Sequence, residues 1–218
     1  MTILGLLNIK GGVGKSTLAA NLAVGIHDLG ISVALVDCDP QRDAIEPVQR
    51  VEPAIEVANP ITQSSIAETI KTLKTLHQIV VVDTPGKSGE AVKALCRVAD
   101  IVLVPLQPSK RDLRGTGQTL KYIRVAQKNR NGKPRAIVLF NFTRKRDIAA
   151  RLFRKQLQPL GVLIANTQLR RLDATRDAQI VLRSRDRTDR AAAAEWKRLL
   201  HEILEFSKTV ANARAGNE

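Results

Sequence analysis

Residues 10–17 have the sequence Lys-Gly-Gly-Val-Gly-Lys-Ser-Thr; they follow an apolar run, Ile3–Ile9, and their last two residues begin a helical pattern, Ser16–Leu29. Glycines in such a loop let backbone N–H groups converge on phosphate oxygens, and the following helix adds the positive end of its dipole. In this setting Lys15 reaches the β- and γ-phosphates of a nucleotide, and the Ser16 hydroxyl ligates Mg²⁺. The stretch therefore predicts a phosphate-binding loop made of Gly11, Gly12, Val13, Gly14, Lys15, Ser16 and Thr17.

The rest of the chain alternates short apolar runs with longer helical segments. Nearly continuous hydrophobicity within each run is typical of strands that are buried on both faces of a parallel sheet. The further runs are Ser32–Asp37, Ile79–Asp83, Ile101–Pro105, Ala136–Phe140 and Val162–Ala165. Helical patterns occupy Ser64–His77, Gly89–Val98, Leu113–Asn129, Asp147–Leu160 and a final segment from about 190 to 210. The alternation predicts a single α/β domain over 1–210 with a doubly wound, mostly parallel sheet, followed by a disordered tail at 211–218.

Two of the predicted strands end in carboxylates. Asp37 and Asp39 close the second strand, and side chains two residues apart at such an end point toward the crevice where open α/β sheets bind ligands. One of them can orient water or assist a metal, and the other can polarise an attacking water. Four apolar residues followed by Asp83 form a Walker B arrangement, which predicts that Asp83 holds Mg²⁺ through water. The predicted metal-site residues are Ser16, Asp37 and Asp83.

Three motifs together resemble the ParA/MinD family of deviant-Walker-A, P-loop ATPases. They are KGGVGKST at 10–17, VDCDPQ at 36–41 and VVVDTPG at 80–86. The general P-loop pattern has a glycine five residues before Gly14, where this chain has Ile9, and a lysine opens the loop instead. The similarity extends over nearly the whole chain, including IVLVPLQPS and the segment that contains Asn141, Thr143 and Arg144.

The resemblance implies roles for individual residues. Lys10 is expected to cross an ATP-bound homodimer to the phosphates of the partner subunit, and Asp39 is expected to be needed for hydrolysis. Contacts with adenine are expected from Asn141, Thr143 and Arg144. With Lys10, Lys15 and Asp39 as catalytic residues, the chain is predicted to be an Mg²⁺-dependent ATPase with weak intrinsic activity that a partner stimulates, because a cation supplied in trans couples hydrolysis to dimerisation.

The charge is distributed unevenly along the chain. The 35 Lys and Arg against 21 Asp and Glu give a net charge of +14. Residues 1–100 contain 9 basic and 11 acidic side chains, whereas residues 101–218 contain 26 basic and 10 acidic ones. A strongly basic second half favours a polyanionic partner, either nucleic acid or an anionic membrane. The two cysteines, Cys38 and Cys96, form no paired motif, which argues against a disulfide scaffold and against the iron–sulfur members of the family.

Two branches of the family fit a basic chain. ParA-type members bind DNA without sequence preference through C-terminal Arg and Lys, whereas MinD-type members bind membranes through a short C-terminal amphipathic helix. The final helix contains Glu195, Glu202 and Glu205 and does not resemble such an anchor, so no membrane binding is expected. The predicted DNA phosphate contacts are Arg183, Arg185, Arg187 and Arg190, with Arg170, Arg171, Arg154 and Lys155 as secondary candidates.

The resemblance thus implies a cytoplasmic, nucleoid-associated ATPase that partitions or positions a plasmid, a chromosome or a protein cargo. Its expected cofactors are ATP and Mg²⁺, and its expected partners are a second copy, nonspecific double-stranded DNA and a ParB-like or other cargo adaptor. Since the loop begins ten residues into the chain, no operator-binding helix-turn-helix domain is expected before it. A MinD-like membrane-binding ATPase is the alternative. A scaffold without chemistry is disfavoured, because Lys15, Asp39 and Asp83 are all present.

Overall fold

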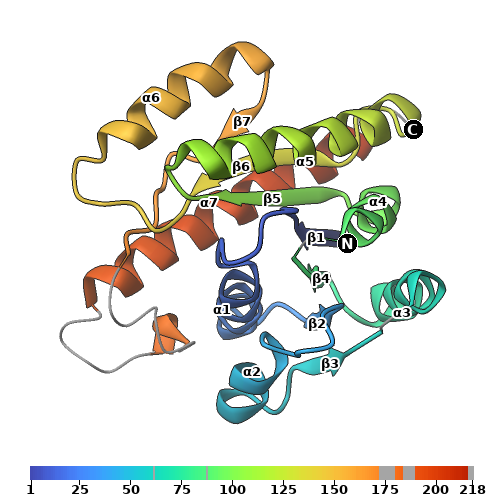
Figure 1. Ribbon diagram of the computed structural model, residues 1–218. Coiled ribbons are helices and arrows are strands. Elements are labelled where there is room, and N and C mark those ends of the chain that lie inside the picture. The colour runs from blue at the N-terminus through green and yellow to red at the C-terminus, as the bar shows by residue number, and fades with distance from the viewer. Residues whose placement is uncertain (61, 87, 172–179, 184–189, 216–218) are drawn as a thin grey trace.

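The computed structural model describes residues 1–218 apart from 61, 87, 172–179, 184–189 and 216–218. Within these residues a seven-stranded parallel sheet lies between two layers of helices (Figure 1). The strands are β1 Thr2–Leu6, β2 Val33–Asp37, β3 Glu56–Ala58, β4 Ile79–Asp83, β5 Ile101–Leu106, β6 Arg135–Phe140 and β7 Leu163–Ile164. The helices are α1 Lys15–Asp28, α2 Ile45–Val51, α3 Gln63–Leu76, α4 Gly89–Val98, α5 Lys110–Asn129, α6 Ile148–Leu157 and α7 Arg190–Ala215, with 3-10 turns η1 Gln158–Leu160 and η3 Val181–Arg183.

The strand order is β3-β2-β4-β1-β5-β6-β7, so the chain adds strands first on one side of β1 and then on the other. In the parallel register Leu6 lies opposite Asp83, and Asp83 lies opposite Asp37 on the next strand. The carboxyl ends of β1, β2 and β4 are therefore level at one edge of the sheet. The doubly wound α/β fold predicted from the sequence is confirmed, and its topology brings the phosphate loop and the aspartates together.

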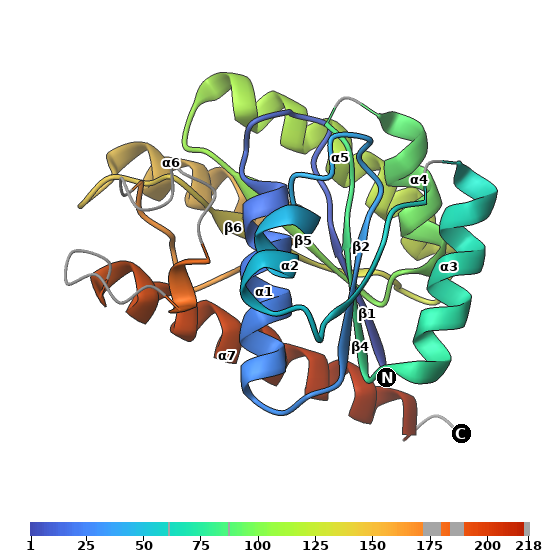
Figure 2. The same cartoon turned by 90° about the horizontal axis from the view of Figure 1, so that it is seen from below.

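Two apolar cores lie on opposite faces of the sheet. One contains side chains of α1, α2 and α7, and the other contains side chains of α3, α4, α5 and α6. Figure 2 shows α1, α2 and α7 on one side of the central strands, and α3 and α4 on the other side. Gly25 in the middle of α1 allows a close approach, because a Cβ there would lie 2.6 Å from Leu182 Cδ1 and 2.9 Å from Leu200 Cδ2. The C-terminal part of the chain is thus packed directly against the helix that begins at the phosphate loop.

Some elements differ from the prediction. The short helix α2 and the three-residue strand β3 were not predicted, because neither is long enough to show a clear periodicity. The last helix continues to Ala215, beyond the predicted end near 210, in a segment rich in alanine, which has the highest helix propensity. Among the described helices, none combines the length and the apolar character needed to cross a bilayer.

Candidate nucleotide site

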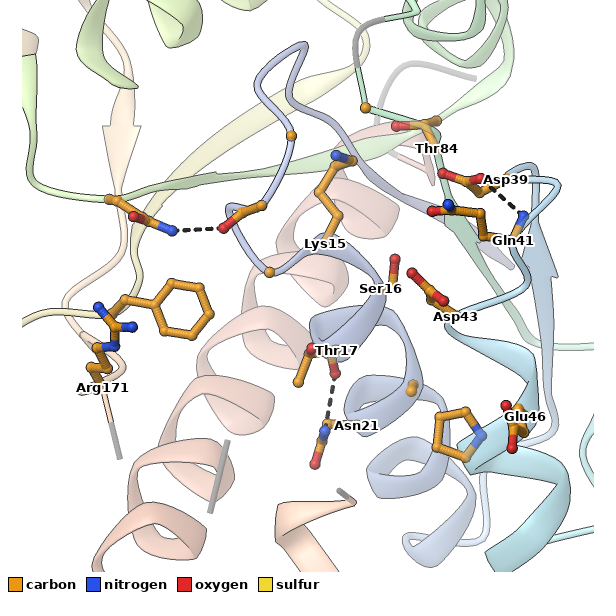
Figure 3. Close-up of a pocket in the computed structure, with 18 of the residues that line it drawn as sticks. Lys15, Ser16, Thr17, Asn21, Asp39, Gln41, Asp43, Glu46, Thr84 and Arg171 are labelled. Carbon is orange, nitrogen blue, oxygen red and sulfur yellow. Dashed lines mark hydrogen bonds between the residues drawn. The ribbon is translucent and has the colours of Figure 1, made fainter. Parts of the chain in front are cut away.

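An open cavity of about 940 Å³ lies at the carboxyl ends of β1, β2 and β4, where the topology predicts a ligand site. Figure 3 shows side chains from the phosphate loop, from the segment after β2 and from the segment after β4 converging on it. Small-molecule sites usually occupy ~300–1,000 Å³, so the cavity has room for a nucleotide. Its walls include described side chains that the sequence analysis did not single out: Asn21, Asp43, Glu46, Arg50, Gln107 and Phe142.

The phosphate loop is held in shape by two amide side chains, Gln107 and Asn141, which directly follow β5 and β6. Gly14, at the start of α1, has φ 88°, in the left-handed region that favours glycine. Asn141 Nδ2 donates to the Val13 carbonyl at 2.8 Å, and Gln107 Nε2 donates to the Gly12 carbonyl at 2.7 Å. Because both carbonyls are held by these amides, the loop N–H groups stay available for an anion at the helix N-terminus. No acidic residue occupies the first turn of α1.

Lys15 is 6% exposed, and in Figure 3 its side chain extends into the cavity. Burial lowers the pKa of its ammonium, and the nearby carboxylates of Asp83 and Asp39 oppose that shift. A buried cation beside two carboxylates gains further stabilisation when a polyanion enters the cavity, since the phosphates would supply additional negative charge. The structure therefore brings Lys15 close to both Asp39 and Asp83.

Asp83 is fully buried, and within the described residues no group makes a hydrogen bond of good geometry to either carboxylate oxygen, although the Ser16 hydroxyl and the Thr84 N–H lie close enough to lower its pKa. Burial raises its pKa to about 7, and the negative charge of Asp37 adds to this shift, while the Ser16 hydroxyl and Lys15 counteract it. A buried carboxylate without a hydrogen bond of good geometry is costly, and a divalent cation that takes oxygen ligands is the kind of group that satisfies it. The residues present therefore fit Mg²⁺, with the Ser16 hydroxyl beside Asp83.

Protein side chains alone would not enclose this ion. The described residues contain no group of three or more His, Cys, Asp or Glu that could hold a metal. Magnesium ordinarily keeps several waters and binds to one or two protein ligands together with substrate phosphates. The sparse set formed by Ser16 and Asp83 is thus consistent with a metal that arrives with a nucleotide.

The two aspartates after β2 occupy different environments. Asp37 is fully buried, and its two oxygens accept hydrogen bonds from the backbone N–H groups of Asp39 at 2.9 Å and Ala44 at 3.0 Å. Burial raises the pKa of Asp37, and these two bonds partly offset the effect. Asp39 lines the cavity and accepts a 3.1 Å bond from the Gln41 N–H. In this state Asp37 organises the loop, and Asp39 is the carboxylate that faces the ligand space.

Lys10 does not line the cavity of this single chain. Its ammonium lies 3.9 Å from Asp112 Oδ1 on α5, and its backbone N–H donates to Asn8 Oδ1 at 2.9 Å. Asn8 in turn donates to the Pro105 carbonyl and to the Thr116 hydroxyl, so the segment before the loop is fastened to α5. The structure therefore separates Lys10 from Lys15 and Asp39, the other two predicted catalytic residues.

The predicted adenine contacts are placed differently from one another. Asn141 and Thr143 are buried, and Thr143 donates to the Leu169 carbonyl, so both serve the loops around the cavity. Arg144 is exposed and does not line the cavity. Phe142 and Arg171 are the members of this region that line it. Phe142 has a φ of 54°, which is uncommon for a bulky residue, and no sequence pattern predicts this backbone conformation.

The predicted DNA contacts are also placed differently. Arg183 donates to Asp28, Glu52 and the Val51 carbonyl, an arrangement that joins η3 to α1 and α2. Arg170 pairs with Glu195, and Arg154 donates to the Ala165 carbonyl while its guanidinium lies over the Phe140 ring. Arg171 lines the cavity, and Arg190 and Lys155 are exposed on α7 and α6. Arg185 and Arg187 lie outside the described residues.

A known protein family and two known proteins are similar to this chain in sequence. The family described as CobQ/CobB/MinD/ParA nucleotide binding domain matches residues 4–180. The chain is 31% identical over 209 residues to the maintenance of carboxysome distribution protein A of Halothiobacillus neapolitanus, which covers 92% of this chain and 95% of that protein. It is 33% identical over 125 residues, 56% of each chain, to the protein ParA of Rhizobium radiobacter.

A solved structure shows the same fold. Cobyrinic acid a,c-diamide synthase from Mycobacterium smegmatis with bound ATP analogue and magnesium superposes with a TM-score of 0.70 at 19% identity, over 95% of this chain and 96% of that one. The family match covers the phosphate loop, the aspartate pair and the Walker B strand, the same motifs that carried the resemblance seen in the sequence. The chain belongs to the CobQ/CobB/MinD/ParA family of nucleotide-binding domains, as its ParA/MinD-like motifs predicted.

Proposed function

We propose that this protein is an ATP-hydrolysing switch of the ParA type, which dimerises on binding ATP, holds double-stranded DNA without sequence preference, and positions a cargo. The observation that carries the proposal is the buried carboxylate of Asp83, which has no hydrogen bond of good geometry and lies near Ser16 and Lys15, together with a phosphate loop whose N–H groups are available to an anion. That arrangement supports a triphosphate with its magnesium. The similarity to a carboxysome distribution protein and to a ParA protein supports a positioning role.

The residues divide the chemistry among themselves. The loop N–H groups and Lys15 hold and neutralise the phosphates, and Ser16 and Asp83 hold Mg²⁺, whose positive charge would offset the charge that develops on the phosphates. Asp39 lines the cavity, and we propose that its carboxylate orients the attacking water. Asp37 keeps the loop that contains Asp39 in place.

Lys10 is the residue that links hydrolysis to dimerisation in this proposal. In the single chain it rests against Asp112, outside its own cavity, and a second subunit would bring it to the partner's phosphates. A solitary chain therefore lacks one of its cations and hydrolyses slowly. The adaptor, ParB-like or specific for another cargo, is proposed to stimulate the step.

The ATPase part is tested with single-turnover hydrolysis and light scattering. Asp83→Asn is expected to abolish Mg²⁺-dependent ATP binding, and Asp39→Ala is expected to bind ATP and to persist as a dimer without hydrolysis. A strict monomer of Asp39→Ala with ATP would refute the switch. Gln49→Ala, an exposed amide on α2 outside the cavity, is the matched control and should behave as wild type.

The DNA part is tested by retention of arbitrary duplex DNA with ATP, ADP or no nucleotide, across a salt series. Charge reversal of Arg185, Arg187 and Arg190 together is expected to remove retention, whereas reversal of the exposed Arg111 and Lys121 on the opposite face of the sheet is the control. Retention that ignores nucleotide would refute the switch. Sedimentation of the ATP-bound protein with anionic liposomes, and no retention of DNA, would favour the membrane-binding alternative.

A further inference from the structure

Asn59, the first residue after β3, holds the segment that contains Asp37 and Asp39. Its Nδ2 donates to the Asp37 carbonyl at 2.6 Å and to the Asp39 carbonyl at 3.0 Å. Both acceptors are carbonyl oxygens, so the side-chain amide must present its nitrogen to them. One side chain, directly after the edge strand β3, thus connects the two residues on either side of Cys38.

The hydrogen bonds that Asn59 donates to this segment complement those that the Asp37 carboxylate accepts from it. The Asp37 carboxylate holds the N–H groups of Asp39 and Ala44, and Asn59 holds the carbonyl groups of Asp37 and Asp39. The peptide groups on both sides of Asp39 are therefore fixed, one through its N–H and the other through its carbonyl. The position of Asn59 itself follows from the sheet register, in which Ala58, directly before it, pairs with Val36.

Asn59 is not one of the described residues that line the cavity. Its side chain bonds to the backbone of Asp39 and not to the Asp39 carboxylate, which lines the cavity. We infer that Asn59 is a positioning residue for ATP hydrolysis, which fixes the backbone of Asp39 so that its carboxylate stays directed at the phosphate end of the site. This inference rests on the role proposed above for Asp39.

Three substitutions of Asn59 distinguish the effect of its hydrogen-bond donation from the effect of its side-chain volume. Asn59→Asp keeps the shape but places a carboxylate against two carbonyl oxygens, so it cannot donate when ionised. Asn59→Ala removes the group, and Asn59→Gln keeps the donor on a longer side chain. Because a displacement of about 1 Å in a catalytic group can cost roughly 100-fold in rate, we expect kcat to fall about 10-fold or more in Asn59→Asp and Asn59→Ala.

The affinity for ATP is expected to stay within about twofold of wild type, because Lys15, Ser16 and the loop are untouched. Asn59→Gln should retain more of the turnover than Asn59→Asp, which a loss of packing alone would not produce. Circular dichroism and a urea midpoint for each variant show that it folds, and Gln49→Ala is the matched amide control.

The turnover of Asp39→Ala is measured in parallel, so that the role of Asn59 can be refuted independently of the proposed role of Asp39. Slow turnover with unchanged ATP affinity in the Asn59 variants, alongside a slow Asp39→Ala, supports the inference. Normal turnover in Asn59→Asp with a slow Asp39→Ala overturns the role of Asn59 alone, as do equal rates for the Gln and Asp variants. Normal turnover in Asp39→Ala overturns the proposed role of Asp39 and the inference with it. Should Asn59→Ala unfold, the difference in turnover between the Asp and Gln variants still supports or overturns the role of Asn59.

Discussion

Alanine substitution of the three loop glycines offers a graded test of the loop geometry. An alanine Cβ at Gly14 would lie 2.5 Å from Asn141 Nδ2 and 3.2 Å from the Phe142 ring, whereas at Gly12 and at Gly11 it would meet nothing within 4 Å. Gly14 and Gly12 have φ of 88° and 73°, both in the left-handed region, and Gly11 does not. An alanine at Gly14 would therefore have both backbone strain and a steric collision, one at Gly12 would have backbone strain alone, and one at Gly11 would have neither.

The magnitudes follow from these contacts. A left-handed backbone costs an L-residue about 1–2 kcal/mol, while replacing glycine stabilises through the unfolded chain by about 0.4–1 kcal/mol. At Gly14 the displaced amide of Asn141 also loses its bond to the Val13 carbonyl, and an unsatisfied buried group costs about 1–3 kcal/mol. We expect the free energy of unfolding to rise by about 0.4–1 kcal/mol for Gly11→Ala, and to fall by about 1 kcal/mol for Gly12→Ala and by about 3 kcal/mol for Gly14→Ala.

Urea unfolding of the nucleotide-free protein, followed by circular dichroism, measures these differences. With a denaturant slope of about 2 kcal/mol per molar, the Gly14→Ala midpoint should lie about 1 M below that of Gly12→Ala. In an Asn141→Ala background the extra cost of Gly14→Ala should shrink, since the closest contact has been removed. Equal midpoints for the Gly12 and Gly14 variants would refute the account of Asn141 as the support of the loop.

Three other perturbations probe the site and its surroundings. Asp83→Asn should stabilise the nucleotide-free protein at pH 8 by about 2–4 kcal/mol, because burial raises the pKa of the Asp83 carboxyl to about 7, and the stability that it contributes below its unfolded pKa is lost as the pH rises through 7. Urea midpoints from pH 4 to 8 should show a larger loss in wild type than in Asp83→Asn, where the raised pKa of the buried Asp37 still contributes. Phe142→Ala should raise the Kd for ATP about 5–10-fold, because one aromatic contact with the ligand is lost, and kcat at saturating ATP should not change. A Kd that calorimetry finds unchanged would show that the ring does not contact ATP. Arg183→Ala should lower the free energy of unfolding by only about 1 kcal/mol, because solvent screens the ion pair that Arg183 makes with Asp28. An unchanged urea midpoint together with a loss of DNA retention would indicate that Arg183 contacts DNA instead.

Much of the fold and of the phosphate site could be predicted from local patterns. The buried strands are continuous apolar runs, and the loop, the aspartates and the helix after the loop are contiguous in the chain. Elements without such a pattern were missed: α2 has only seven residues and β3 only three, and β3 is at the edge of the sheet, where hydrophobicity is weak. Asn59, which follows β3, has no motif around it, so its contact with Asp39 could not be predicted.

By itself the sequence determined the chemistry of the phosphate end, because that chemistry depends on backbone conformation and spacing within a few residues of Gly14 and at the ends of apolar runs. Only the tertiary structure decided the roles of residues whose partners are far away in the chain. Asn141 supports Val13 across 128 residues, and Arg183 reaches Asp28 across 155. Both residues looked like ligand contacts in the sequence, and their partners became known only through the packing of the helices on the sheet. A side chain's charge or amide group is encoded locally, but whether it meets a ligand or another part of the protein depends on the whole fold.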